Sequence, residues 1–312
     1  MKKKVLLTVL LMLVSFGSLS GFALAQEEKP TIVVTTTVLG SIVNDLLGKE
    51  VEIITLVPPG SCPAHFDLKP SDVEAIRKAK VILAHGFEPW IEKISSKVIK
   101  VSGGWNTADL AKKLYKKVAK VLKTALPQYL NNIESNLTKA LKKLDSLEKK
   151  VAKDRKGLKD IRAIVMKWQA PFVKWLGISI LATYPPPETM SASQIERIIA
   201  VGRVKKAMLV IDNLQSGISM GRKLSAEIGA VHVVLTNFPG SLPGVKNIPD
   251  MIEHNLKQVL NGVKAYRHQV KRIARLEAEI SDLNGRLKFW KAVSAVALGI
   301  VIIESFMLLK RR

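Results

Sequence analysis

Short runs of β-branched and aliphatic residues alternate with helical segments twice along this chain of 312 residues, and this alternation limits the fold more than any other feature. The runs predict buried strands, because β-branched side chains pack well on a pleated surface. Strands that alternate with helices form parallel sheets covered by helices. The strands that we expect are residues 31–37, 51–57, 81–84 and 98–101 in the first series, and 161–165, 178–183, 207–211 and 231–235 in the second.

Between the two series, leucines and valines recur at helical spacing over residues 107–156, with a break at Pro127. We therefore predict an α/β fold: an N-terminal lobe (26–106), connecting helices that form a long backbone (107–156), and a C-terminal lobe (157–264). The sequence Ser71-Asp72-Val73-Glu74 is typical of a capping box that begins a helix. The other helices that we expect in the lobes are residues 39–47, 90–95, 171–176, 193–201, 217–228 and 250–262.

The two ends of the chain indicate export and a membrane anchor. Residues 1–25 form a basic start, an apolar stretch and a small-residue cleavage site, which is typical of a signal peptide. Residues 292–309 are apolar enough to cross a membrane as one helix, and the basic residues 310–312 predict a cytoplasmic tail. The chain is therefore expected in the cell membrane as a single-pass protein, with its lobes on the extracytoplasmic face.

The segment between the second lobe and the apolar helix, residues 265–291, predicts a helical stalk. Its apolar residues Ile273, Leu276, Ile280, Leu283 and Leu287 alternate spacings of three and four, as in a coiled-coil seam. The seam is short, so the stalk is either a dimerising element or a helical spacer.

The formal net charge of +23 raises the question of nucleic-acid binding. Residues 111–160 hold 15 Lys and Arg against 5 Asp and Glu, which accounts for much of the excess. Lysines on a solvated pair of helices explain this better than a nucleic-acid site, since both ends of the chain indicate export. We therefore expect no nucleic-acid partner.

A loop stiffened by prolines carries the single cysteine, Cys62, and His65 three residues later. A thiolate and an imidazole at this spacing suit Zn(II), and a softer set that includes methionine suits Cu(I). His85 follows the third predicted strand, so it falls at the same carboxyl edge of the sheet, where ligands bind in parallel α/β folds. The competing interpretation is a buried free cysteine beside a structural histidine.

Several segments carry a family likeness: 56–60, 69–73, 86–90 and 105–107 in the first half, and 175–177, 210–212 and 221–229 in the second. In these segments the chain resembles the solute-binding proteins of zinc and manganese ABC importers, and the resemblance covers roughly residues 30–263. It implies that a transition metal ion is held between the lobes as transported ligand, rather than as a catalytic cofactor, and is delivered to an ABC permease.

The family's ligand positions are altered in this chain. The histidine expected in the first loop appears one place late, as His65, and the one expected before Trp105 is replaced by glycines. The third position falls on Met166 and the fourth on Thr236-Asn237. The metal ligands that we predict are accordingly Cys62, His65, His85 and Met166, whereas Asp212 at a strand end is expected to cap a helix.

No nucleophile elbow, phosphate loop or paired carboxylates stand out, so we do not expect an enzyme. We predict a tethered extracytoplasmic receptor of an ABC importer that captures zinc, with manganese or copper as other cargoes. The alternative is the same fold without metal binding, as a small-solute receptor or a surface adhesin or sensor.

Overall fold

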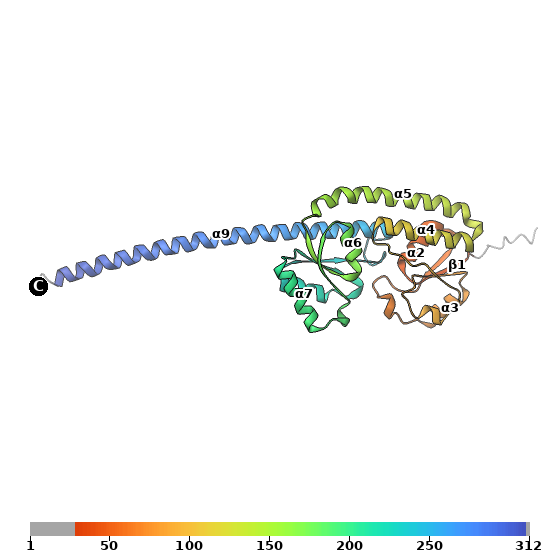
Figure 1. Cartoon of the computed structure of the whole chain (residues 1–312), viewed down its shortest axis with the longest axis horizontal. Helices are drawn as coiled ribbons and strands as arrows, with labels where there is room; N and C mark the ends of the chain where they lie inside the picture. Colours follow the sequence, from red (N-terminus) through yellow and green to blue (C-terminus); the bar gives the residue numbers. More distant parts are fainter. Residues whose placement is uncertain (1–28, 310–312) are drawn as a thin grey trace, which may run out of the picture.

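The structure, a computed structural model, describes residues 29–309 and contains two parallel four-stranded sheets. The strand order is β2-β1-β3-β4 in the first sheet and β6-β5-β7-β8 in the second, so both lobes share one topology. Figure 1 shows the lobes side by side, with helices running along one side of both. The predicted fold class, two α/β lobes joined by helices, is confirmed. The predicted signal peptide and cytoplasmic tail lie outside the described residues.

The first lobe is built around two central strands, β1 and β3, whose side chains are nearly all buried on both faces of the sheet. In β1, Ile32 pairs with Ile53 on one side and with Val81 on the other. This lobe contains β1 (Thr31–Val34), α2 (Thr37–Leu47), β2 (Glu52–Thr55), α3 (Pro70–Lys78), β3 (Val81–Ala84) and β4 (Val98–Lys100).

The second lobe repeats this arrangement with longer strands. Its central strand β5 lies between β6 and β7, and Ala163, Ile164 and Val165 are fully buried. This lobe contains β5 (Arg162–Met166), α6 (Ala170–Trp175), β6 (Ser179–Tyr184), α7 (Ala192–Val204), β7 (Leu209–Asn213), α8 (Ser219–Ile228) and β8 (Val231–Leu235).

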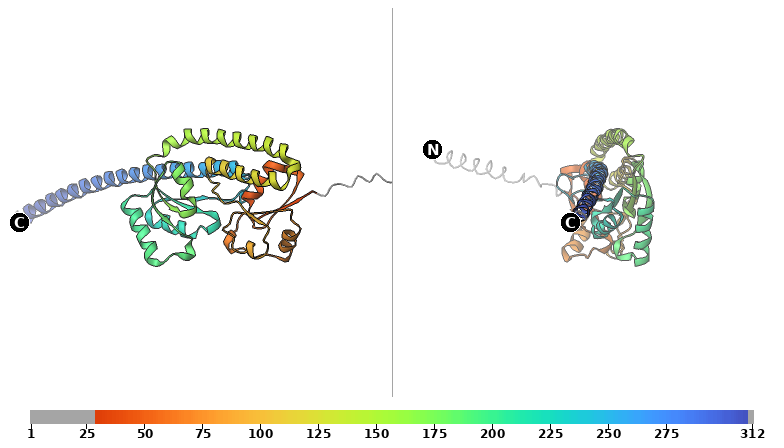
Figure 2. Two further views of the ribbon diagram at one scale, coloured as in Figure 1. Left: turned by 45° about the vertical axis from the view of Figure 1, so that its right-hand side comes forward. Right: turned by 90° about the vertical axis from the view of Figure 1, so that its left-hand side faces the viewer.

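The connecting segment forms two antiparallel helices, α4 (Ala108–Ala125) and α5 (Leu130–Asp154), separated near Pro127 as the sequence predicts. In the left view of Figure 2, α5 runs along both lobes. One continuous apolar core contains Ile42 of the first lobe, Leu144 of α5 and Phe172 of the second lobe. The two lobes and α5 are therefore packed together through one core.

The helix predicted for residues 250–262, the stalk and the apolar segment form one unbroken helix, α9 (Ile248–Leu309). Its proline, Pro249, lies in the first turn, where it does not interrupt the helix, and Gly262 packs so closely on Val233 that a larger residue would not fit. Its first turns pack against β8 and α5, and the remainder projects away from the lobes (Figure 1).

Two local predictions were wrong. Helix α3 begins at Pro70 rather than with a Ser71 cap, because proline suits the first helical position, where no N–H partner is required. Asp72 nevertheless accepts a hydrogen bond of 2.9 Å from the Lys69 N–H. The helix predicted at 90–95 is only a 3₁₀ turn, Ile91–Lys93.

Candidate solute-binding cavity between the lobes

Loops from both sheets meet at the carboxyl ends of the strands and enclose one cavity between the lobes. The first lobe contributes the loops after β2, β3 and β4, and the second lobe contributes those after β5, β7 and β8. This is where ligands bind in open parallel sheets, because loops from neighbouring strands converge there. The cavity has a volume of about 480 Å³, which is within the range of small-molecule sites.

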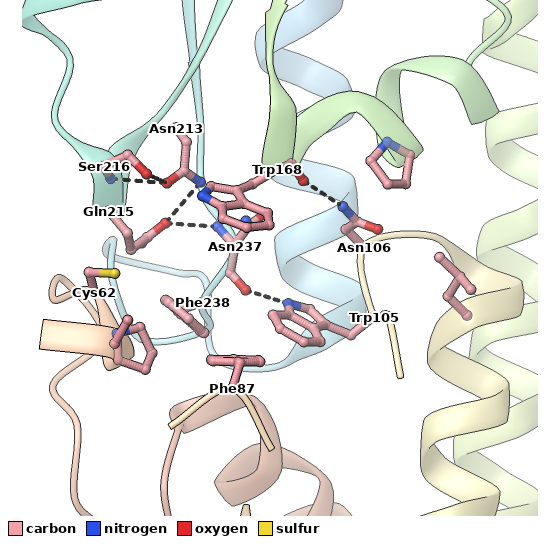
Figure 3. Close-up of a pocket in the computed structure, with 15 residues that line it drawn as sticks. Cys62, Phe87, Trp105, Asn106, Trp168, Asn213, Gln215, Ser216, Asn237 and Phe238 are labelled. Carbon is pink, nitrogen blue, oxygen red and sulfur yellow. Dashed lines mark hydrogen bonds between the residues drawn. The ribbon is translucent and has the colours of Figure 1, made fainter. Parts of the chain in front are cut away.

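Aromatic side chains from both lobes form much of the cavity wall (Figure 3). The Trp105 and Phe238 rings lie 6.1 Å apart and nearly parallel, and the Phe87 and Trp105 rings lie 6.2 Å apart. Trp168 contributes a fourth ring, which is 49% exposed, and the Lys167 Nζ lies 4.3 Å from its centroid. The wall therefore offers flat apolar faces to a bound molecule.

Four amide side chains supply most of the cavity's polar groups. The Asn106 Nδ2 donates to the Trp168 carbonyl at 3.3 Å, and the Asn237 Oδ1 accepts from Gln169 at 3.0 Å. The Asn213 Oδ1 accepts from the Ser216 N–H at 3.0 Å. Within the part of the chain that the structure describes, no Asp, Glu, Lys, Arg or His lines the cavity. The four amide residues in its wall are Asn106, Asn213, Gln215 and Asn237.

Direct hydrogen bonds across the cavity hold the lobes together. The Trp105 Nε1 donates to the Asn237 carbonyl at 2.7 Å, and the Gln215 Nε2 donates to the Pro59 carbonyl at 3.0 Å. A solute would therefore enter through separation of these loops and be enclosed when they close.

Of the predicted metal ligands, Cys62 lies in the cavity wall, and its thiol is half-buried (Figure 3). His65 lies on the same 3₁₀ turn, Pro63–His65, but its side chain is exposed and is not part of the wall. The Trp90 indole donates a 2.8 Å hydrogen bond to the Pro63 carbonyl and fixes this turn against the first lobe.

His85 is 3% exposed and lies behind the wall, where it contacts the Trp105 ring at 4.5 Å and stacks on Phe87 at 5.1 Å. Its Nε2 lies 2.9 Å from the Thr36 hydroxyl. Burial lowers the pKa of His85 to about 4, although the nearby Glu88 carboxylate favours the charged form. The imidazole is therefore neutral at physiological pH and supports the aromatic wall.

Glu88 fixes the loop that carries these rings. Its carboxylate accepts hydrogen bonds from the Gly86 N–H at 2.8 Å and the Phe87 N–H at 3.0 Å, and from the Thr35 hydroxyl at 2.5 Å. A buried carboxylate with several donors is well compensated, so the loop is held rigidly.

Met166 is fully buried at the end of β5, in an apolar cluster with Ile164 and Tyr184. Its sulfur accepts a 3.3 Å hydrogen bond from the Trp168 N–H. Met166 thus positions the Trp168 loop, and the structure does not place it in the wall beside Cys62.

A transition metal ion requires several donor atoms at bonding distance. Among the residues 29–309, no group of three or more His, Cys, Asp and Glu side chains lies close enough to hold one. The donors present, as they stand, do not fit a metal ion.

Asp212 is not the N-cap residue of α8, which is Ile218, but its carboxylate binds the first turn of that helix. Its Oδ2 accepts a 3.1 Å hydrogen bond from the Gly221 N–H in the first turn of α8 and lies 3.2 Å from the His232 Nε2. Sequence analysis missed Trp168, Gln215 and Phe238 as wall residues. The available signal was their position directly after strands that were correctly predicted.

Comparison with protein families matches this chain to a model that describes a periplasmic protein, component A of a zinc-uptake complex (ZnuA). The match covers residues 32–104 and 103–262, which includes both lobes and the connecting helices.

Two curated relatives match parts of the chain. An uncharacterized protein of Rickettsia prowazekii is 30% identical over 178 residues, which cover 49% of this chain and 60% of that protein. A Thermotoga maritima protein, provisionally named a metal-binding protein, is 40% identical over 105 residues, 33% of this chain and 35% of its own length. The chain thus spans less than two thirds of the curated relatives that it matches.

Solved structures share the fold. A zinc-bound ZnuA deletion mutant is 20% identical with a TM-score of 0.66, and the match covers 75% of this chain and 98% of that one. A manganese-bound periplasmic metal-binding protein of Candidatus Liberibacter asiaticus is 15% identical with a TM-score of 0.67, covering 75% and 100%. Part of this chain therefore lies outside the region that it shares with these structures.

Proposed function

This chain belongs to the ZnuA family of periplasmic zinc-uptake components, and from that premise we propose that it is a solute-binding receptor of an ABC importer. It would capture its cargo between the lobes on the extracytoplasmic face and deliver it to a permease, without catalysing a reaction. The observation that carries this proposal is the cavity of about 480 Å³ enclosed by loops of both lobes.

The geometry of the cavity favours a small organic solute as cargo. A metal ion needs charged or strongly donating ligands, whereas aromatic faces and amides line this cavity. Loss of metal binding from a receptor of this family agrees with the altered ligand positions that the sequence shows.

A transition metal ion is the second candidate cargo, because the family takes up zinc and Cys62 lies in the cavity wall. Zinc is the first choice, with manganese or copper as others. The proposed ligands are Cys62, His65, His85 and Met166, and the loops that carry them would have to rearrange to bring them together.

We further propose that α9 tethers the receptor to the membrane. Within the described residues, α9 is the helix that is long and apolar enough to span a bilayer. Apolar side chains of its last part, such as Val296 and Ile302, are 64% and 60% exposed, and a lipid environment would cover them. The lobes would stand off the membrane on the projecting stalk, which we propose pairs with a second copy.

The receptor proposal is tested on the full chain, purified in mild detergent. Native mass spectrometry should detect a bound solute that is released on unfolding. Metal analysis of the same sample distinguishes a metal ion from an organic solute as the cargo. A metal cargo predicts that added Zn²⁺, Mn²⁺ or Cu⁺ raises the Tm, and that Cys62→Ser with His65→Ala abolishes the rise. His268→Ala, which changes an exposed histidine of α9, is the matched control.

The receptor proposal fails if the preparation retains neither a metal nor a small molecule, and its Tm responds to no metal ion and to none of the organic compounds named below.

A further inference from the structure

We infer that the cavity between the lobes binds an uncharged, planar aromatic solute, stacked on the rings of its wall. This inference rests on the proposed receptor function and names the class of cargo.

The wall presents aromatic faces at the spacing that favours stacking. The Trp105 ring centroid lies 6.2 Å from that of Phe87 and 6.1 Å from that of Phe238, with interplanar angles of 33° and 25°. Aromatic pairs prefer offset or edge arrangements with centroids 4.5–7 Å apart, so these rings already form a preorganised group. Phe87 and Trp105 come from the first lobe and Phe238 from the second, so a stacked solute would contact both lobes.

The position of the rings is fixed before any solute enters. The Trp105 indole donates to the Asn237 carbonyl at 2.7 Å, and the His85 ring packs behind it at 4.5 Å. Four hydrogen bonds to Glu88 hold the loop that carries Phe87. Binding to preorganised rings requires little side-chain ordering, which favours affinity.

The absence of charge in the described wall argues against an ionic solute. A charged group that leaves water without a partner loses hydration that the apolar wall does not replace. An organic cation could still use aromatic faces. However, the Lys167 ammonium already lies over the Trp168 ring, 4.3 Å from its centroid, and repels a second cation there.

Two amide groups remain available for the polar edge of a solute. The Asn106 side chain uses its Nδ2 to bond the Trp168 carbonyl, and its Oδ1 has no hydrogen-bond partner among the described residues. The Asn237 side chain uses its Oδ1 to accept from Gln169, and its Nδ2 likewise has no partner there. Both residues line the cavity, so a solute with one donor and one acceptor on its edge would be recognised.

The test measures the Tm of the full chain in detergent with added compounds. The uncharged set is indole, quinoline, adenine and p-cresol, and the charged counterparts are indole-3-acetate and tryptamine. We expect at least one uncharged compound to raise the Tm and to bind in calorimetry, and both charged compounds to have no effect.

Matched variants locate the binding. Trp168→Ala removes a wall ring that is 49% exposed, whereas Trp290→Ala removes a tryptophan of α9 that is 61% exposed. Because both rings are exposed, neither change should prevent folding, which circular dichroism checks. Trp168→Ala should weaken binding of the active compound about two- to tenfold, the value of one stacking contact, and Trp290→Ala should not change it.

The inference is overturned when none of the four uncharged compounds raises the Tm, when the charged compounds bind as tightly, or when Trp290→Ala weakens binding as much as Trp168→Ala. A parallel measurement with added ZnCl₂ distinguishes failure of this inference from failure of the receptor proposal. If zinc raises the Tm and no aromatic compound does, the receptor proposal stands with a metal cargo and the aromatic inference fails.

Discussion

The side-chain amide of Gln215 donates a 3.0 Å hydrogen bond to the carbonyl oxygen of Pro59, although the two residues lie 156 positions apart. The same amide donates to the Thr236 hydroxyl at 2.9 Å, and its Oε1 accepts from the Asn237 N–H at 3.0 Å. Gln215 therefore connects two loops of the second lobe to the loop of the first lobe that carries Cys62.

Replacing Gln215 with alanine should loosen the closed arrangement of the lobes. The Pro59 carbonyl can find water, so we expect a loss of about 1 kcal/mol in the free energy of unfolding, which is typical of one or two hydrogen bonds. Urea unfolding of the full chain measures this loss, and X-ray scattering should show a larger radius of gyration. Gln128→Ala, at an exposed glutamine between α4 and α5, is the control and should change neither quantity. Equal scattering from both variants would show that this bond does not hold the lobes.

Gly221 should not tolerate alanine, because the added methyl group would collide with the carboxylate of Asp212. A Cβ at Gly221 would lie 2.2 Å from the Asp212 Oδ2 and 2.9 Å from the His232 Nε2. The collision would displace a buried carboxylate that accepts a hydrogen bond from the first turn of α8, so we expect Gly221→Ala to cost about 1–3 kcal/mol of unfolding free energy.

The control for this variant is Gly285→Ala in α9, where no atom lies within 4 Å of the new Cβ. Alanine favours a helix over glycine, so this change should not lower the Tm. If Gly221→Ala unfolds at the same temperature and urea concentration as the unchanged protein, the close packing of α8 on Asp212 is contradicted.

The strands could be predicted from the sequence because burial on both faces of a parallel sheet leaves a continuous apolar signal. Residues 81–84 and 231–235 were predicted with their exact bounds. Helix α9 was predicted as three separate segments because its apolar pattern changes between lobe, stalk and membrane segment. A helix continues through such changes when no proline or capping residue ends it.

The sequence indicates where the cavity lies, but it does not indicate which side chains line it. Cys62 and the aromatic residues follow predicted strands, so their convergence at one edge followed from topology. The orientation of each side chain depends on local turns, however. His65 points to solvent because the 3₁₀ turn Pro63–His65 leaves it exposed, and Met166 packs inward because strand residues alternate between the faces of a sheet.

The pair formed by the half-buried Asp45 of α2 and the buried Tyr115 of α4 should make stability depend on pH. The Tyr115 hydroxyl donates to the Asp45 Oδ2 at 2.5 Å. Burial raises the pKa of Asp45 above its ordinary value of 3.8, and the charge of Asp250 adds to this, while Tyr115 and Lys143 oppose it. The folded protein therefore binds a proton that the unfolded chain releases first.

The unfolding free energy that Asp45 contributes is consequently fully present below pH 3.8 and is lost as the pH rises through the raised pKa. We expect Asp45→Asn to remove this component, so the difference in unfolding free energy between variant and unchanged protein should change as the pH rises from 3.8 through the raised pKa of Asp45. Urea titrations across this range measure the difference. A difference that stays constant across these pH values would contradict the assignment.

The exposed seam of α9 should pair two copies of the chain. Ile273, Leu276 and Ile280 are 47%, 47% and 57% exposed, and Leu283 and Leu287 continue the same spacing. Burial of such a stripe against an identical helix removes it from water, as in a coiled coil. We therefore expect sedimentation of the full chain in detergent to give the mass of a dimer, and Ile280→Glu to shift it towards the monomer because a carboxylate in the seam remains unpaired.

Ser281→Glu adds the same charge one position outside the seam and should leave the dimer intact. If the unchanged chain already sediments as a monomer at the highest concentration reached, the stalk is a spacer, and its apolar face must be covered by something other than a second copy.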